Sequence, residues 1–217
     1  MSSFENLESK LIFLRSFYQL TTEPFREIMR KIEVGEEPYV PNNPKDDEQP
    51  FLGELREAEE GLGLQGQVCL TVLQRSFKEF LHSTVQQRRS YANNEPREKG
   101  NWFANYKAWF LAQEAIDWDK APICLGTLEE LTLARNCVQH EGRSANIGTM
   151  TGLVKMQGEN YHARFPNGFF GDEFEKLLRM SKSSQPLTIT LTLEKLDAVI
   201  EDMLAFCKYI DEHLPAA

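Results

Sequence analysis

Apolar side chains recur every three or four positions through most of this chain, and that spacing constrains the fold more than any other feature. Segments 4–33, 51–89 and 193–213 each carry such a series, and segment 101–116 carries an aromatic one. This spacing places the apolar residues on one face of an α-helix, and that face must be buried against another element. Hydrophobic residues make up 41% of the 217 residues, enough for a real core. The pattern predicts a mainly α-helical bundle, with residues 1–217 forming a single domain.

Two of the predicted helices contain residues that interrupt helices. Pro24 lies inside the first series and predicts a kink or a break there, where Thr21 and Thr22 could cap a second half. Gly61 and Gly63 could break the second helix in the same way. Between these helices, residues 35–50 carry four prolines and five acidic side chains, which predicts an acidic, Pro-rich loop or linker.

A shorter helix is predicted over residues 128–141. Thr127 and Glu130 fit the Ser/Thr-x-x-Glu pattern of a capping box at its start. Gly142 suits the left-handed position just after its end. Leu128, Leu131, Ala134 and Val138 recur at helical spacing and predict its buried stripe.

The pattern changes after this helix. Residues 149–170 contain two short segments around turn-like Gly-Glu-Asn, which is typical of a β-hairpin. Residues 187–193 alternate threonine with aliphatic residues, as a half-buried strand does. The sequence therefore predicts a small β insertion over about 149–193, before the last helix. Thr192 is the expected N-cap of that helix.

Several classes of protein are disfavoured by what the sequence contains. The four cysteines are far apart and form no CxxC or other metal-ligand spacing, so we expect reduced, buried thiols and no metal. The chain has no nucleotide-binding glycine loop, so no cofactor is predicted. No apolar segment approaches the length of a membrane span, and no secretory signal precedes the first helix, which predicts a cytoplasmic protein without membrane contact.

The end of the 128–141 helix carries side chains that suit phosphate chemistry. Arg135 and Asn136 are adjacent, and His140 follows five residues after the arginine. An imidazole titrates near neutral pH and can transfer protons. A guanidinium offers a planar set of donors to a phosphate that gains charge in a transition state. Arg143, just beyond the helix, could add a phosphate contact. This set fits metal-free RNA cleavage, in which a 2′-hydroxyl attacks the adjacent phosphate and leaves a 2′,3′-cyclic phosphate.

Geometry limits how these side chains meet on one helix. Asn136 and His140 share a face, but Arg135 and His140 lie about 140° apart on an ideal helix. A closer meeting needs a distorted helix end or a second copy of the helix facing the first, which suggests a two-fold homodimer. A purely structural interpretation fits the same residues, in which Arg135 is a solvated side chain and His140 caps the last carbonyls of the helix.

The central part of the chain holds the one basic stretch of a protein whose net charge is -9. Arg88 and Arg89 end the second predicted helix and are candidate substrate-binding residues. The overall acidic balance argues against a non-specific nucleic-acid coat, although a local basic cleft remains compatible with it. Cations are also favoured at a helix C-terminus for purely structural reasons.

The segment Arg135-Asn136-Cys137-Val138-Gln139-His140 resembles the Arg-x4–6-His motif of the HEPN superfamily, in which a polar residue often follows the arginine. Residues 64–82 also resemble the long second HEPN helix in their apolar spacing. The resemblance implies a helical bundle, a homodimer with the motif helices facing each other, and a metal-independent endoribonuclease. Arg135 and His140 would be catalytic, with Asn136 supporting them.

The resemblance also implies a biological setting and an alternative. HEPN proteins occur in toxin–antitoxin, phage-defence and RNA-processing systems, so RNA is the expected substrate and an antitoxin or other protein is an expected partner. Some members are non-catalytic modules that dimerise and bind a protein or a nucleotide. The β insertion at 149–193 is a departure from the minimal bundle.

Overall fold

The computed structural model of this protein describes residues 2–40, 50–88, 95–96, 102–123, 125–139 and 191–215. About 85% of these residues are helical, and no strand occurs among them, which confirms the predicted mainly α-helical class. The described residues form five α-helices and one 3-10 turn, in the order α1 (Ser3–Val34), α2 (Leu52–Arg88), α3 (Trp102–Glu114), η1 (Trp118–Lys120), α4 (Leu125–Gln139) and α8 (Leu193–His213). The predicted β insertion lies outside the described residues, apart from residues 191–193, where Thr192 is extended and Leu193 begins α8.

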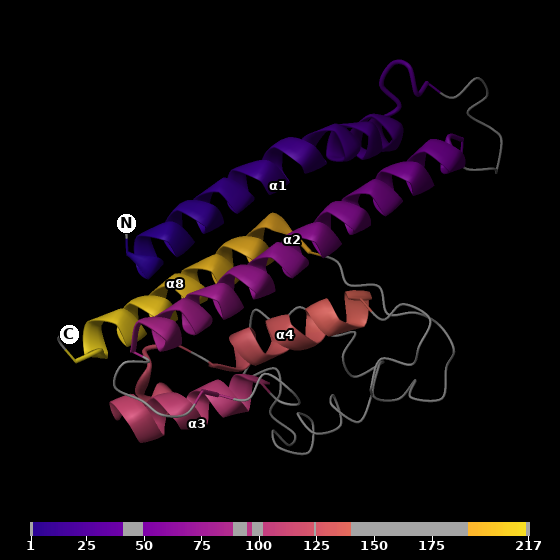
Figure 1. Cartoon of the computed structure of the whole chain (residues 1–217). Helices are drawn as coiled ribbons and strands as arrows, with labels where there is room; N and C mark the ends of the chain where they lie inside the picture. Colours follow the sequence, from indigo (N-terminus) through magenta and orange to yellow (C-terminus); the bar gives the residue numbers. More distant parts are fainter. Residues whose placement is uncertain are drawn as a thin grey trace, which may run out of the picture.

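The two longest helices form an antiparallel hairpin that supports the other elements (Figure 1). Helix α8 packs against the N-terminal half of α1 and the C-terminal half of α2, and α4 packs against α2 and α8. The described ends of the chain both lie at the end of the molecule where α1 begins (Figure 1). The far half of the α1–α2 hairpin extends beyond α8 and α4.

The expected interruptions do not break the long helices. Helix α1 continues past Pro24, and α2 continues past Gly61 and Gly63. Thr22 does not cap a second helix, because its hydroxyl donates to the Tyr18 carbonyl at 2.6 Å within α1. Pro24 lies on the exposed side of α1, where water can satisfy the carbonyl that the proline leaves without a helical donor.

The two ends of α1 are fixed by local chemistry. Ser2 accepts a hydrogen bond from the Glu5 backbone N–H, and the Glu5 carboxylate accepts one from the Ser2 N–H, which forms a capping box. Gly35 ends the helix in the left-handed region with φ of 66°. The described part of the predicted 35–50 loop, residues 35–40 and residue 50, is not helical, as expected.

An aromatic cluster forms the centre of the core between α2, α3, η1 and α8. The Trp118 ring lies 4.9 Å from the Phe206 ring, 5.2 Å from Phe103 and 5.6 Å from Phe110, measured between ring centroids. Ala115 reverses the chain after α3 with φ of 57°, so that Ile116 and Trp118 return into this core. The aromatic stripe of α3 is therefore core, as the sequence predicts.

The start of α8 is attached to α1 through one buried hydrogen bond. The Tyr18 hydroxyl donates to the Leu191 carbonyl. The next residue, Thr192, is the N-cap of α8 and accepts from the Lys195 N–H at 3.2 Å. Burial raises the pKa of Tyr18, so its hydroxyl stays protonated as a donor at neutral pH.

We expect Tyr18→Phe to lower the free energy of unfolding by about 1–3 kcal/mol, because the Leu191 carbonyl then loses its buried donor. Urea unfolding followed by circular dichroism measures this loss. Tyr209→Phe is the matched control: it also removes a hydroxyl that donates to a carbonyl, that of Asp117 at 3.0 Å, but at a partly exposed site. A loss in Tyr18→Phe no larger than in the control would contradict the anchoring role.

Candidate functional site

The candidate site is the C-terminal half of α4, a helix held in the core on one face. Leu128, Leu131 and Ala134 are fully buried, as predicted. These residues fix the rotation of α4 against α2 and α8. Arg135 follows Ala134, so it emerges about 100° around the helix, at the edge of the buried face.

The start of α4 differs from the prediction. The helix begins at Leu125, so Thr127 and Glu130 lie inside it and do not form a capping box at its N-terminus. Both side chains are buried. Burial raises the pKa of Asp202 on α8, and a hydrogen bond between Asp202 and Thr127 partly opposes this rise. Thr127 therefore serves to join α4 to α8, a tertiary role that the local pattern did not reveal.

Arg135 is the motif residue whose side chain the structure describes, and it lies half-buried on α4. Its Nε atom is inaccessible to solvent. Desolvation lowers the pKa of Arg135, although a guanidinium stays protonated at neutral pH. A partly desolvated guanidinium interacts more strongly with an anion than one in bulk water, because the local dielectric constant is lower.

The other motif residues can be placed only along the chain. Asn136 lies on α4, one residue after Arg135, and its side chain is outside the described part. His140 directly follows Gln139, the last described residue of α4, so His140 and Arg143 lie outside the described residues. The predicted meeting of Arg135 with His140, within one chain or across a dimer, stays a prediction.

Of the two basic candidates at the end of α2, the structure describes Arg88 and does not describe Arg89. Arg88 is buried, with 10% of its side chain exposed, and its Nη2 lies 3.3 Å from a Glu114 carboxylate oxygen. The same nitrogen donates to the Pro215 carbonyl at 2.7 Å. The ion pair joins the C-terminal ends of α2 and α3, and the hydrogen bond joins α2 to the segment after α8. These contacts favour a structural role for Arg88 over a substrate contact. Arg89 lies outside the described residues.

The described residues contain no group of three or more histidine, cysteine, aspartate or glutamate side chains that could hold a metal ion. In the same part of the chain, no helix is both long and apolar enough to cross a membrane. Cys69 and Cys207 are free thiols in the core, and burial raises the pKa of both. They serve as small core residues, as the sequence indicates.

Comparison with known proteins finds no family model, no curated protein and no solved structure that matches this chain.

Proposed function

We propose that this protein is a metal-independent endoribonuclease of the HEPN type. The observation that carries the proposal is the spacing Arg135-x4-His140 at the end of α4, a helix packed in the core of a mainly helical protein. A core helix holds its side chains in fixed directions, as a site for ordered chemistry needs. The partial desolvation of Arg135 supports a role in binding phosphate.

The reaction we propose is attack of an RNA 2′-hydroxyl on its own 3′-phosphate. A base takes the proton of the 2′-hydroxyl, the bond to the 5′-oxygen breaks, and an acid protonates that leaving oxygen. His140 supplies the proton transfer, and Arg135 stabilises the charge that develops on the phosphate. Asn136 orients the imidazole or donates to the phosphate. Two chains with facing motif helices would supply one histidine as base and one as acid.

The resemblance also suggests where such an enzyme acts. A toxin–antitoxin or phage-defence setting would pair this chain with an antitoxin or another protein that restrains RNA cleavage. RNA cleavage by this chain would then be stronger without that partner than with it.

One observation favours a second candidate, a non-catalytic HEPN-like module that dimerises and binds a protein or a nucleotide. Arg135 is partly buried, and a guanidinium at the edge of a core can stabilise packing through its aliphatic stem. Under this alternative, removing the motif side chains changes the stability of the protein, and neither the wild type nor the variant cleaves RNA.

Incubation of the purified protein with total RNA in excess chelator tests the proposal, next to the Arg135→Ala/His140→Ala double variant. Cleavage by the wild type alone is the expected result. Size-exclusion chromatography with light scattering checks that the variant keeps its fold and mass. Cleavage by both proteins would place the activity at another site or in a contaminant, and cleavage by neither would favour the non-catalytic module.

A further inference from the structure

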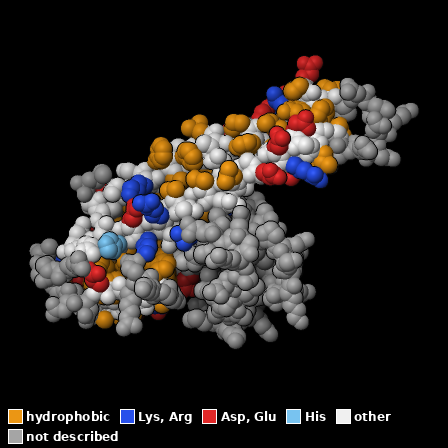
Figure 2. Space-filling view, turned by 45° about the vertical axis from the view of Figure 1, so that its right-hand side comes forward, with side chains coloured by type: hydrophobic (Ala, Val, Ile, Leu, Met, Phe, Trp, Pro, Cys, Tyr) orange, Lys and Arg blue, Asp and Glu red, His pale blue; other side chains and the backbone are white. Residues whose placement is uncertain are grey.

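The outer side of the α1–α2 hairpin carries a row of exposed apolar side chains, which we call the outer seam. On α1 it comprises Phe13, 70% exposed, Leu20, 76% exposed, and Phe17, which stacks on Phe13. On α2 it comprises Leu64, Val68 and Val72, with exposed fractions of 58%, 41% and 38%. Figure 2 shows hydrophobic side chains gathered along the hairpin face in view. Contiguous apolar surface of this kind marks interaction sites more often than scattered single residues do.

The register of the hairpin places these residues side by side. Lys10 pairs with Glu79 at 3.0 Å, and Phe25 lies against Gly61, so the helices run antiparallel with Leu20 near the level of Val68. Leu64 and Val68 lie about half a helical turn around α2 from Phe77, a residue that contacts Phe206 of α8. The outer seam therefore faces away from α8.

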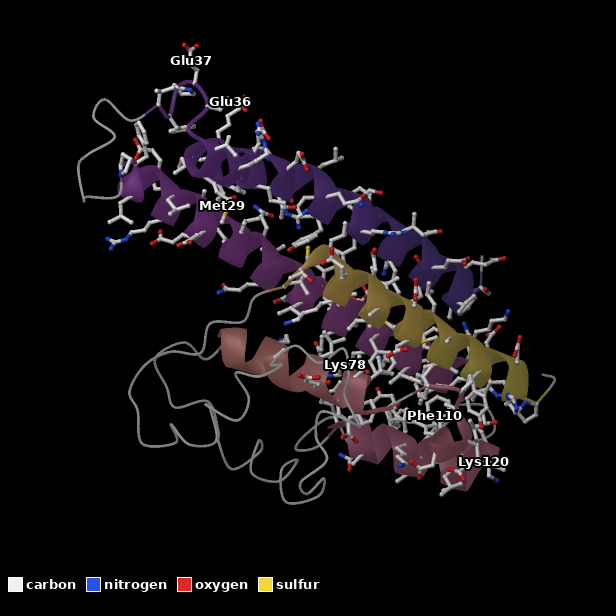
Figure 3. All side chains as sticks on the ribbon, turned by 180° about the vertical axis from the view of Figure 1, so that it is seen from behind. Met29, Glu36, Glu37, Lys78, Phe110 and Lys120 are labelled. Carbon is white, nitrogen blue, oxygen red and sulfur yellow. The ribbon has the colours of Figure 1, made fainter. Side chains whose placement is uncertain are left out.

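The far half of the hairpin has no third layer among the described elements. Among the described residues between Thr22 on α1 and Gly66 on α2, Ala58 is the only buried hydrophobic one. Most other apolar residues of this stretch are half-buried, namely Phe25, Ile28, Met29, Ile32, Leu55 and Leu62, whereas Val34, Leu52 and Leu64 are exposed. Met29 lies in this part, which extends beyond α8 (Figure 3). A pair of helices normally needs a further layer to bury its apolar faces.

Charges at the two ends of the seam are complementary to each other. Glu57 and Arg75 lie on the same side of α2 as Leu64 and Val68, because the separation of 18 residues equals five helical turns, about 27 Å. Arg75 has 78% of its side chain exposed, although it also pairs with Glu79 on its own helix. A second copy lying antiparallel across the seam, with the two-fold axis level with residue 66, would place Glu57 of each chain opposite Arg75 of the other. Leu64 would then meet Val68 of the other copy.

We propose that the outer seam is an interface between two copies of this chain. The two α1–α2 hairpins pack face to face and antiparallel, as a four-helix bundle. The two-fold arrangement buries Leu64 and Val68 of both copies and forms the Glu57–Arg75 pair twice. This interface is separate from the facing motif helices of the proposed nuclease. Its existence does not depend on RNA cleavage.

Analytical ultracentrifugation of the full chain tests the interface with one matched pair of variants. Leu64→Glu places a charge in the seam, whereas Leu111→Glu makes the same change at an equally exposed leucine, 53% exposed, on α3. We expect Leu64→Glu to have half the mass of the wild type, and Leu111→Glu to match the wild type. Circular dichroism verifies that both variants keep their helix content. Equal masses for Leu64→Glu and the wild type would overturn the proposal. This holds also when both proteins are dimers, because such a dimer would form through another surface, such as α4.

A charge exchange tests the antiparallel orientation. Glu57→Arg and Arg75→Glu should each weaken self-association by about tenfold, because every changed pair occurs twice in the dimer. The double variant Glu57→Arg/Arg75→Glu restores opposite charges across the interface and should regain most of the wild-type affinity. A double variant no tighter than either single variant would overturn this arrangement.

Discussion

His140→Ala is expected to lower the rate of RNA cleavage by about 100- to 10,000-fold, because the variant loses the side chain that transfers protons near neutral pH. Arg135→Lys is expected to lower the rate by about 100-fold or more. A lysine keeps the positive charge but not the planar set of donors that matches a phosphate. Single-turnover cleavage of a labelled RNA measures both rates. The expected losses should appear in the rate at saturating protein, since both groups act on the transition state.

The controls for this prediction come from the same chain. His82 is an exposed histidine on α2 that lies outside the motif, so His82→Ala should cleave at the wild-type rate. Thermal unfolding shows whether His140→Ala and Arg135→Lys remain folded at the assay temperature. Full activity in His140→Ala, or an equal loss in His82→Ala, would remove the motif from the mechanism.

Trp118→Ala should cause the largest loss of stability, about 3–5 kcal/mol in the free energy of unfolding. The side chain is 1% exposed and touches rings from α3 and α8, so its removal leaves a large cavity in the centre of the core. Folded proteins are stable by only about 5–15 kcal/mol, so this variant would lie close to its unfolding limit. Guanidinium unfolding followed by circular dichroism at 222 nm gives the free energy.

Two further variants show whether the cavity is the cause. Trp118→Phe keeps most of the apolar contact, and the indole N–H that it removes has no acceptor among the described residues, so its loss should be much smaller. Trp102→Ala removes a half-buried tryptophan at the edge of the same cluster. A loss in Trp118→Ala no greater than in Trp102→Ala would contradict the central position of Trp118.

An apolar series and a cap located α8 correctly, whereas the same two signals misplaced the start of α4. The prediction for α8, residues 193–213 with Thr192 as N-cap, is confirmed because both signals are local. The interruptions were harder to interpret. Gly61 was a possible helix break, but a Cβ at that position would clash with the Phe25 ring. This glycine therefore allows two helices to approach, a tertiary reason that one segment cannot reveal.

The candidate site was predictable only in part for a related reason. The apolar stripe placed Leu131 and Ala134 correctly in the core, and the edge position of Arg135 follows from it. The role of Arg88 depends on partners 26 and 127 residues away, Glu114 and Pro215, and no local pattern predicts such pairs. A buried arginine and a substrate-binding arginine give the same sequence pattern when a helix ends with several basic residues.

The chemistry of the RNA ends tests the central claim most directly. Wild-type protein is incubated with a defined RNA in excess chelator, and the new ends are identified by mass spectrometry. The proposed mechanism predicts a 2′,3′-cyclic phosphate on the upstream fragment and a 5′-hydroxyl on the downstream one. Products carrying a 5′-phosphate, or cleavage that chelator abolishes, would contradict it.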